Sequence, residues 1–271
     1  TSQSSAASDV YKRQREDSRA IGHTEQTPEQ RMVDWRQLAA TAHAGEALLL
    51  LDRPPEDDPK ETTEAPVQVG QQLLQAIDAA TSEVWLISAY LIPTEELEAA
   101  IQRAEKRGVQ VRILTNSINS NNHLTAHSAY RKHIEALVDM GVEVHEVKAQ
   151  AKDRNLYIQS PVEDKSLCLH AKLLILDNDR AFVGSANLDP RSLQINTEMG
   201  ILIESEALNA ELRQLLEPDF SPRNAWQVQR DENGRMVWVS DDEVISHQPT
   251  HSYMRRIEDW FLSLLPIEDE M

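Results

Sequence analysis

Several features that mark particular classes of protein are scarce in this sequence. Cys168 is the single cysteine, so the chain cannot form an internal disulfide. Lysine and arginine total 27 against 45 aspartates and glutamates, and the formal charge of −18 argues against a surface that follows nucleic acid or adsorbs to anionic lipid. No apolar run approaches the roughly 20 residues of a membrane span, and the longest, residues 47–52, has the length of a strand. Any membrane contact of this sequence is therefore expected to be peripheral.

What is present suffices for one folded domain in which helices alternate with strands. The chain has 271 residues, 40% of them hydrophobic, which is enough for a full core. Helical patterns begin near Pro28 and occupy residues 69–80, 94–108 and 125–139. Strand patterns occupy residues 83–88, 109–115, 142–147, 167–176, 181–183 and 199–204. This order predicts an α/β fold with a mixed, largely parallel sheet that is flanked by helices on both faces.

The most informative segment is HAKLLILDNDRAFVGSANLDPRS, residues 170–192. Residues 167–176 are a short apolar run that ends at the turn-forming Asp177, so they predict a buried strand. Because side chains alternate along a strand, one face is wholly apolar and the other carries His170 and Lys172 side by side. A lysine rarely enters a buried strand without a partner for its charge, and an anion is the obvious partner. We expect Asp177 to fix its loop through hydrogen bonds rather than to transfer protons.

These side chains together suit the cleavage of a phosphodiester. A neutral imidazole such as that of His170 can attack phosphorus and hold it as a covalent phosphohistidine. Lys172 can then neutralise the phosphoryl oxygens, where charge develops in the transition state. In the turn that follows, Gly184 lets the backbone approach a ligand closely, and Ser185 and Asn187 add uncharged donors. The spacing therefore predicts a phosphate-binding site.

The same run resembles the HKD motif of the phospholipase D superfamily, in which His170, Lys172 and Asp177 form the catalytic set. The continuations NLDPRS and NTEMG resemble the bacterial cardiolipin synthases of that superfamily, especially those of the C type. The resemblance covers residues 45–271 and corresponds to the C-terminal half of those enzymes. It implies a phospholipase D-like fold, of which this chain supplies one of two pseudo-twofold halves.

The resemblance implies a phosphatidyl transfer that uses no metal and no organic cofactor. Such enzymes carry two HKD motifs: one histidine attacks the phospholipid phosphate, and the other protonates the leaving alcohol and then activates the second substrate. The implied substrates are phosphatidylglycerol and a second phospholipid. The implied location is the bacterial inner membrane, with peripheral contact or an anchor in the N-terminal half, and no nucleic acid is expected as a partner.

Further candidates for the site lie around the motif. Glu198 matches a family acid that could orient the ring of the nucleophile, or it is an exposed carboxylate at the end of a strand. Tyr90 follows a predicted strand and could line the pocket or pack in the core. His127 and Tyr130 match a family segment near the active site. Arg191 could clamp a second phosphate or tie down its own loop.

One HKD motif is present, because none of the other eight histidines is followed by a lysine two residues later and then an aspartate. The sequence begins at Thr1, and residues 4–14 resemble translated sequencing adapter, so we expect a fragment whose first motif lies upstream. We expect residues 1–30 to be a disordered, non-native leader and residues 31–68 to be a remnant and linker from the missing N-terminal half. Residues 69–271 are then the catalytic half-domain with its tail.

Two other functions stay open at this point. The chain could complete its site by homodimerisation and act as a phosphodiesterase, nuclease or phospholipase, as the one-motif nucleases of the superfamily do. It could also be a fragment that folds without turnover. A nuclease would need a basic groove, which the composition does not promise.

The tail, residues 255–268, has the spacing of an amphipathic helix. Its apolar side holds Ile257, Trp260, Phe261, Leu264 and Leu265. Such a helix either packs on the core, which is the commoner arrangement, or lies on a membrane interface with its aromatic side chains at headgroup depth. The two arrangements differ in whether this stripe faces solvent in the folded chain, and a solvent-facing stripe would favour a membrane or the missing half as its partner.

Overall fold

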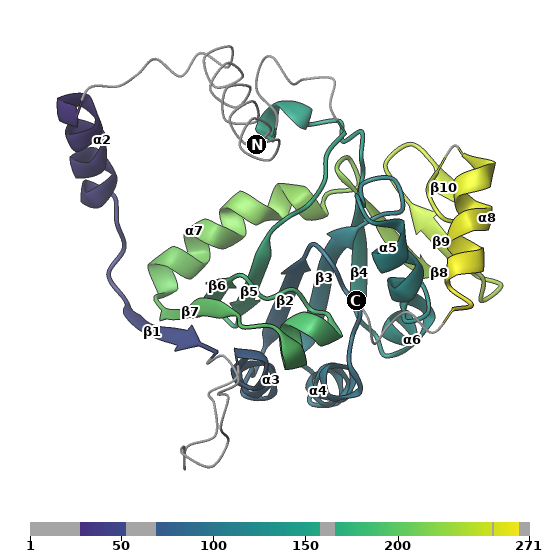
Figure 1. Cartoon of the computed structure of the whole chain (residues 1–271), viewed down its shortest axis with the longest axis horizontal. Coiled ribbons are helices and arrows are strands. Elements are labelled where there is room, and N and C mark those ends of the chain that lie inside the picture. The colour runs from purple at the N-terminus through teal and green to yellow at the C-terminus, as the bar shows by residue number, and fades with distance from the viewer. Residues whose placement is uncertain (1–27, 53–68, 158–165, 251, 266–271) are drawn as a thin grey trace, which may run out of the picture. The chain divides into compact units, whose positions relative to one another are not determined.

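The computed structural model describes four stretches of the chain, residues 28–52, 69–157, 166–250 and 252–265 (Figure 1). Most of the predicted leader and linker, and the last residues of the predicted tail, lie outside the described residues. The described residues divide into two units, and those of the smaller one are residues 28–43 and 154–157. Its described elements are helix α2 (Pro28–Ala40), which confirms the helix predicted near Pro28, and the short turn η1 (Arg154–Leu156).

The larger unit is built on one ten-stranded sheet with the order β1-β7-β6-β5-β2-β3-β4-β8-β9-β10 (Figure 1). Its strands are β1 (Glu46–Leu51), β2 (Glu83–Ser88), β3 (Gln110–Asn116), β4 (Glu143–Val147), β5 (Lys172–Leu176), β6 (Arg180–Gly184), β7 (Met199–Glu204), β8 (Ala225–Arg230), β9 (Met236–Val239) and β10 (Val244–Ile245). The predicted strand patterns are thus found in the expected places. Residues 46–51, which we assigned to a remnant and linker, are the edge strand of this sheet.

The pairing of the strands corrects the prediction of a largely parallel sheet. β2, β3 and β4 run parallel to one another, whereas all the other neighbouring strands of the described sheet run antiparallel. The reason lies in the second half of the chain, where β5 enters beside β2 from the opposite direction, β6 returns by the short turn at residues 177–179, and β7 returns after the longer connection of residues 185–198. Short connections can join only antiparallel neighbours, since a parallel pair needs a crossover of a dozen or more residues.

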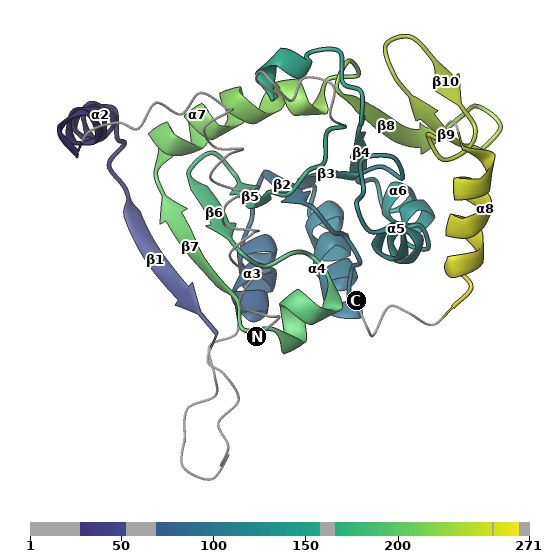
Figure 2. The same ribbon diagram turned by 45° about the horizontal axis from the view of Figure 1, so that its top comes forward.

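Helices cover both faces of the sheet, as predicted (Figure 2). One face carries α3 (Val69–Asp78) and α4 (Glu95–Lys106), which pack against buried side chains such as Phe182. The other face carries α7 (Glu206–Leu216), whose Leu212 and Leu216 pack on a second apolar cluster. The remaining helical elements are α5 (Leu124–Tyr130), α6 (Ile134–Asp139), η2 (Arg191–Ile195), η3 (Glu217–Phe220) and α8 (Tyr253–Leu262). No helix in the described part of the chain has the length and apolarity to cross a bilayer.

Of two predicted helices, one has the bounds that its local capping signals predicted, and the other is interrupted where its residues contact other helices. The helix predicted over residues 94–108 is confirmed as α4: the Thr94 hydroxyl accepts a hydrogen bond from the Leu97 backbone N–H, and Gly108 follows with a φ of 83°. The helix predicted over residues 125–139 is divided into α5 and α6. At the break, Arg131 donates a hydrogen bond to Asp259 on α8, and His133 forms one with Glu98 on α4. Contacts with two different neighbours therefore accompany the break.

Candidate active site

The candidate site lies at the edge of the sheet where β2 and β3 end and β5 begins. Lys172, the first residue of β5, is paired with Ser88, the last residue of β2. His170 precedes the strand and is exposed to solvent. Strand β5 therefore starts five residues later than the predicted strand over residues 167–176. Ligand sites of open α/β sheets commonly lie at the carboxyl ends of parallel strands, and this edge contains two such ends.

His170 and Lys172 are in contact, as the strand alternation predicted. Lys172 Nζ lies 3.0 Å from the His170 carbonyl oxygen and 3.4 Å from His170 Nδ1. Burial lowers the pKa of Lys172, and the nearby negative charges of Asp189 and Glu198 oppose this shift. The arrangement presents an imidazole and an amine at one position, with two carboxylates close to the amine.

Asn116, the last residue of β3, holds the segment that carries His170. Its side-chain Nδ2 donates to the carbonyl oxygens of Leu169 and Ala89, each at 2.9 Å, and its Oδ1 accepts from the Leu169 backbone N–H, also at 2.9 Å. A further bond joins the Ala89 N–H to the Ala171 carbonyl oxygen at 3.1 Å. His170 is thus placed between two anchored neighbours. Sequence reasoning missed Asn116, although a polar residue at the end of a buried strand pattern was a usable signal.

The predicted phosphate-binding residues of the next turn are partly engaged in holding the turn together. The Ser185 hydroxyl donates to Glu198 Oε2 and accepts from the Met199 N–H at 3.0 Å. Asn196 Nδ2 donates to the other Glu198 oxygen at 3.2 Å. Glu198 is buried, and its described partners do not include His170. The two Glu198 oxygens therefore close the Ser185 turn; the alternative of an exposed carboxylate is wrong, and a role of Glu198 in orienting the His170 ring stays a prediction.

Packing requires a glycine at position 184, and the approach of a ligand to its backbone stays a prediction. A Cβ atom at Gly184 would lie 2.5 Å from Phe182 Cζ and 2.6 Å from the Met199 carbonyl oxygen. Its partner across the ladder is Gly200, where a Cβ would meet the same ring at 2.2 Å. The Phe182 ring therefore occupies the space above this glycine pair.

Asp177 lies at the opposite end of β5 from His170, so it is not brought to the site. Its carboxylate accepts from the backbone N–H groups of Thr81, Ser82 and Glu83 and from Arg180 at 3.1 Å. Burial by itself would raise the pKa of Asp177, but the three N–H groups outweigh it and hold the pKa well below its usual range. The expectation that Asp177 fixes its loop agrees with this geometry, whereas its membership of a catalytic set does not.

An open pocket of about 320 Å³ is lined partly by the second half of the motif run, residues 187–192, while His170 and Lys172 are not among its lining residues. Its lining includes the predicted residues Tyr90, Asn187 and Arg191, and also His123 and Asp189, which sequence reasoning missed. Asn187 Oδ1 is buried and has no hydrogen-bond partner among the residues that the structure describes. Burial raises the pKa of Asp189, although Ser192 donates to it from its backbone N–H at 2.7 Å. The sequence Asp-Pro at the start of η2 was a helix-start signal that could have identified Asp189.

His127 and Tyr130 are not in this pocket, contrary to the prediction. Both are buried; His127 Nδ1 lies 2.7 Å from Asp259 Oδ1, and the Tyr130 hydroxyl donates to Glu146 Oε1 at 3.2 Å. Burial raises the pKa of Glu146 to about 7. These groups form a polar cluster between α5, β4 and α8, and their described bonds join these elements.

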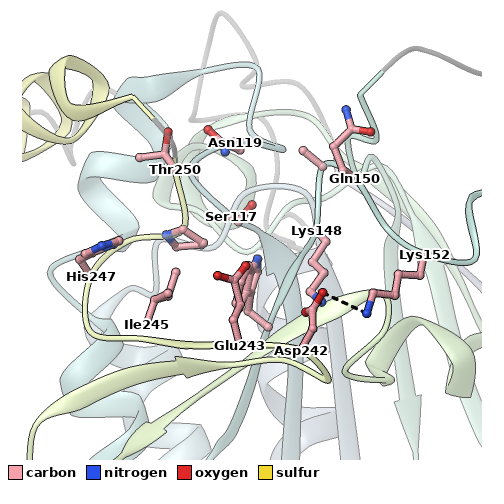
Figure 3. Close-up of a pocket in the computed structure, with 13 residues that line it drawn as sticks. Ser117, Asn119, Lys148, Gln150, Lys152, Asp242, Glu243, Ile245, His247 and Thr250 are labelled. Carbon is pink, nitrogen blue, oxygen red and sulfur yellow. Dashed lines mark ion pairs between the residues drawn. The ribbon is translucent and has the colours of Figure 1, made fainter.

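A second pocket, of about 230 Å³, lies beyond the end of β4 and contains none of the motif residues (Figure 3). Lys148 and Lys152 line it, and both are committed to ion pairs. Lys148 Nζ is 3.3 Å from Asp241, and Lys152 Nζ is 2.8 Å from Asp241 and 3.0 Å from Asp242. Because these cations already have carboxylate partners, the pocket is a poor candidate for binding a phosphate.

Across the stretches that the structure describes, no three histidine, cysteine, aspartate or glutamate side chains converge in a way that could hold a metal ion. The groups at this edge of the sheet are an imidazole, an amine, carboxylates, amides and hydroxyls. An imidazole beside an amine can attack or protonate a phosphate ester while the amine neutralises its oxygens.

The sequence of this chain matches a known protein family and is similar to several known proteins. The family model described as "Cardiolipin synthase, PLD-like domain" matches residues 73–220, which contain the whole motif. Cardiolipin synthase C of Escherichia coli (strain K12) is 32% identical over 206 residues, which covers 73% of this chain and 43% of that protein. Cardiolipin synthase A of Pseudomonas aeruginosa (strain LESB58) is 32% identical over 148 residues, or 55% of this chain and 26% of that protein. The chain spans less than half of the length of these relatives.

Solved structures also show similarity. Nuc, a phospholipase D family member from Salmonella typhimurium, superposes with a TM-score of 0.46 at 17% identity, covering 69% of this chain and 99% of Nuc. Phosphatidylserine synthase of Haemophilus influenzae Rd KW20 superposes with a TM-score of 0.49 at 13% identity, covering 69% of this chain and 41% of the synthase.

Proposed function

The chain belongs to the family of cardiolipin synthase PLD-like domains, and we propose that it supplies one half of the active site of a phosphatidyltransferase. The observation that carries the proposal is the contact between His170 and Lys172 at the sheet edge. The formal charge of −18 argues against a nucleic acid as substrate. The proposed substrates are phosphatidylglycerol and a second phospholipid, at the bacterial inner membrane.

In the proposed reaction, His170 attacks the phosphorus through Nε2, since Nδ1 faces Lys172. The new N–P bond forms as the P–O bond to the first alcohol breaks. The leaving oxygen takes the electron pair and receives a proton from a second histidine. A hydroxyl of the second phospholipid then returns a proton to that histidine and attacks the phosphohistidine, which frees His170. Lys172 stabilises the negative charge on the phosphoryl oxygens throughout.

The second histidine is proposed to come from another half-site. One imidazole cannot attack the phosphate and protonate the leaving alcohol in the same step. An N-terminal HKD half on the same longer protein would supply it in a synthase, and a second copy of this chain would supply it in a hydrolytic homodimer. The products distinguish the two, because transfer gives cardiolipin and hydrolysis gives phosphatidic acid.

The test uses a substrate that does not need the second histidine. Bis(p-nitrophenyl) phosphate loses p-nitrophenolate, a stable anion that leaves without protonation. We expect the chain to release p-nitrophenolate in a burst and to retain an acid-labile phosphoryl group on His170, which mass spectrometry of peptides can locate. His170→Ala should lose both signals. The control is His247→Ala, at an exposed histidine that lines the other pocket, which should keep them.

The outcome with lipid completes the test. With labelled phosphatidylglycerol, we expect little cardiolipin from the monomeric chain, because the second proton donor is missing. Absence of any covalent phosphoryl group on wild-type protein, or an undiminished burst in His170→Ala, would refute the proposed function. Robust cardiolipin formation by the monomer would refute the requirement for a second half-site.

A further inference from the structure

Helix α8 is attached to the sheet unit by its polar side and turns its apolar side to solvent. Asp259 is fully buried. The apolar side chains along the other side are between 41% and 71% exposed, and they are Tyr253, Met254, Ile257, Trp260, Phe261 and Leu264. They recur every three or four residues, so they form one continuous stripe along the helix. This is the reverse of an ordinary surface helix, whose apolar stripe faces the core.

The buried side of α8 explains why the helix has this orientation. Asp259 accepts hydrogen bonds from Ser128 and Arg131, each at 3.0 Å, and lies 2.7 Å from His127 Nδ1. Burial alone would raise the pKa of Asp259, but His127, Ser128 and Arg131 together lower it, so the carboxylate is ionised. Turning the apolar stripe inward would leave this charge without partners, which is strongly unfavourable in a protein interior. The fold therefore holds the stripe outward.

One cationic side chain of α8, Arg256, borders the exposed stripe. Arg256 lies 5.6 Å from the centre of the Tyr253 ring, on the first turn of α8. Arg131 bonds to Asp259 from the neighbouring helix and is about one third exposed, and Lys132 Nζ donates to the Leu265 carbonyl oxygen at 3.1 Å. Arg256 lies where an anionic headgroup would meet a helix at a bilayer interface, whereas Arg131 is paired with Asp259 on the buried side and Glu258 of α8 is exposed.

The start of α8 is also linked to the candidate site. Arg255 donates to the Asn121 carbonyl oxygen at 3.1 Å, and the next residue, Asn122, accepts from the Tyr90 hydroxyl at 2.9 Å. Tyr90 and His123 line the open pocket of about 320 Å³. A surface bound by α8 would therefore adjoin the rim of this pocket. Figures 1 and 2 both show α8 beside α5, the helix that follows this link.

We propose that α8 is the membrane-docking element of this protein and that its exposed stripe lies at the boundary of headgroups and acyl chains of an anionic phospholipid bilayer. The stripe combines tyrosine, tryptophan and phenylalanine with aliphatic side chains, a composition that suits this boundary. The choice of a lipid surface as the occupant rests on the proposed function, in which the substrate is a phospholipid.

The test measures binding of the full chain to vesicles by flotation. Wild-type protein should bind vesicles of phosphatidylcholine that contain about one third phosphatidylglycerol, and the double variant Trp260→Ser/Phe261→Ser should bind about a hundredfold more weakly, because two aromatic side chains no longer leave water. The matched control is Trp35→Ser, which removes an exposed tryptophan from another helix and should bind as wild type does. Arg256→Gln should weaken binding about fivefold, and only to vesicles with phosphatidylglycerol.

Several outcomes would overturn the proposal. They are wild-type protein that does not float with the anionic vesicles, a double variant that binds like wild type, and a Trp35→Ser variant that loses as much affinity as the double variant. A double variant that loses only self-association in sedimentation velocity would identify the stripe as a protein contact instead. The burst with bis(p-nitrophenyl) phosphate, a soluble substrate, should be unchanged in the double variant, so failure of the docking proposal is distinguishable from failure of the proposed function.

Discussion

Asn116 offers a direct test of how the fold positions His170. Its side chain makes three hydrogen bonds to main-chain atoms of Ala89 and Leu169, all at 2.9 Å. The substitution Asn116→Ala removes all three bonds and leaves the Leu169 N–H and carbonyl oxygen without their partner. We expect the segment before β5 to loosen while β5 itself stays paired with β2 and β6.

The chain contains a closely matched control at the other end of the same strand. Asn209, on α7, donates to the carbonyl oxygens of Leu176 and Arg180 at 3.4 and 2.7 Å, and accepts from Arg213 Nε at 2.8 Å. Asn116 and Asn209 are each 1% exposed. Each substitution by alanine therefore removes three hydrogen bonds of a buried amide. At a net value of about 0.5 to 1.5 kcal/mol for each bond, both should lower the free energy of unfolding by about 3 kcal/mol.

The catalytic effect should separate the two variants. A displacement of about 1 Å in a reacting group can reduce a rate constant about a hundredfold. We expect Asn116→Ala to lower the rate constant of the p-nitrophenolate burst by about ten- to a hundredfold at saturating substrate, with little change in the concentration for half saturation. Asn209→Ala should leave the rate constant for each folded molecule close to that of wild type, because its bonds lie at the Leu176 end of the strand.

Hydrogen exchange provides a measurement that does not depend on turnover. In Asn116→Ala, the amide of Leu169 should exchange faster, while the amides of β5 keep their protection relative to the global stability. Urea denaturation of both variants supplies the stability needed for this comparison. The reasoning fails if Asn209→Ala slows the burst as much as Asn116→Ala does. It also fails if Leu169 stays protected in Asn116→Ala.

Two further predictions concern stability. Asp177→Asn should lower the free energy of unfolding by on the order of 3 kcal/mol, because a charged acceptor of several hydrogen bonds is lost, yet keep the burst for each folded molecule. The native pKa of Asp177 lies below the ordinary 3.8, so the difference in free energy of unfolding between wild type and this variant should narrow as the pH falls below 3.8. A difference that does not change with pH would contradict the lowered pKa of Asp177. For Glu146, whose pKa rises from 4.5 to about 7, wild type binds an extra proton when folded and should lose on the order of 3 kcal/mol of stability as the pH rises through this window. Glu146→Gln should remove this loss when the free energy of unfolding is measured by urea denaturation at the two ends of the window. Wild type and variant free energies of unfolding that change equally with pH would refute the pKa shift.

Much of the local structure could be predicted because it depends on neighbours in the sequence. The strand patterns that became β2 and β7 were placed with their observed bounds, and the Thr94 and Gly108 signals bounded α4. The contact of His170 with Lys172 was predicted from strand alternation and is found, although His170 precedes β5. The direction of strand pairing did not follow, because an apolar run has the same pattern in a parallel and an antiparallel sheet.

The sequence by itself determined the chemistry at the site: the motif spacing, the shared side of His170 and Lys172, and the family to which the chain belongs. The tertiary structure alone decided which groups support that chemistry. Asn116 reaches Leu169 across 53 positions, and His127 reaches Asp259 across 132. Such contacts depend on how strands and helices pack, which no local pattern encodes. The same limit applies to α8, whose spacing gave an amphipathic helix but whose orientation follows from the partners of Asp259 on another element.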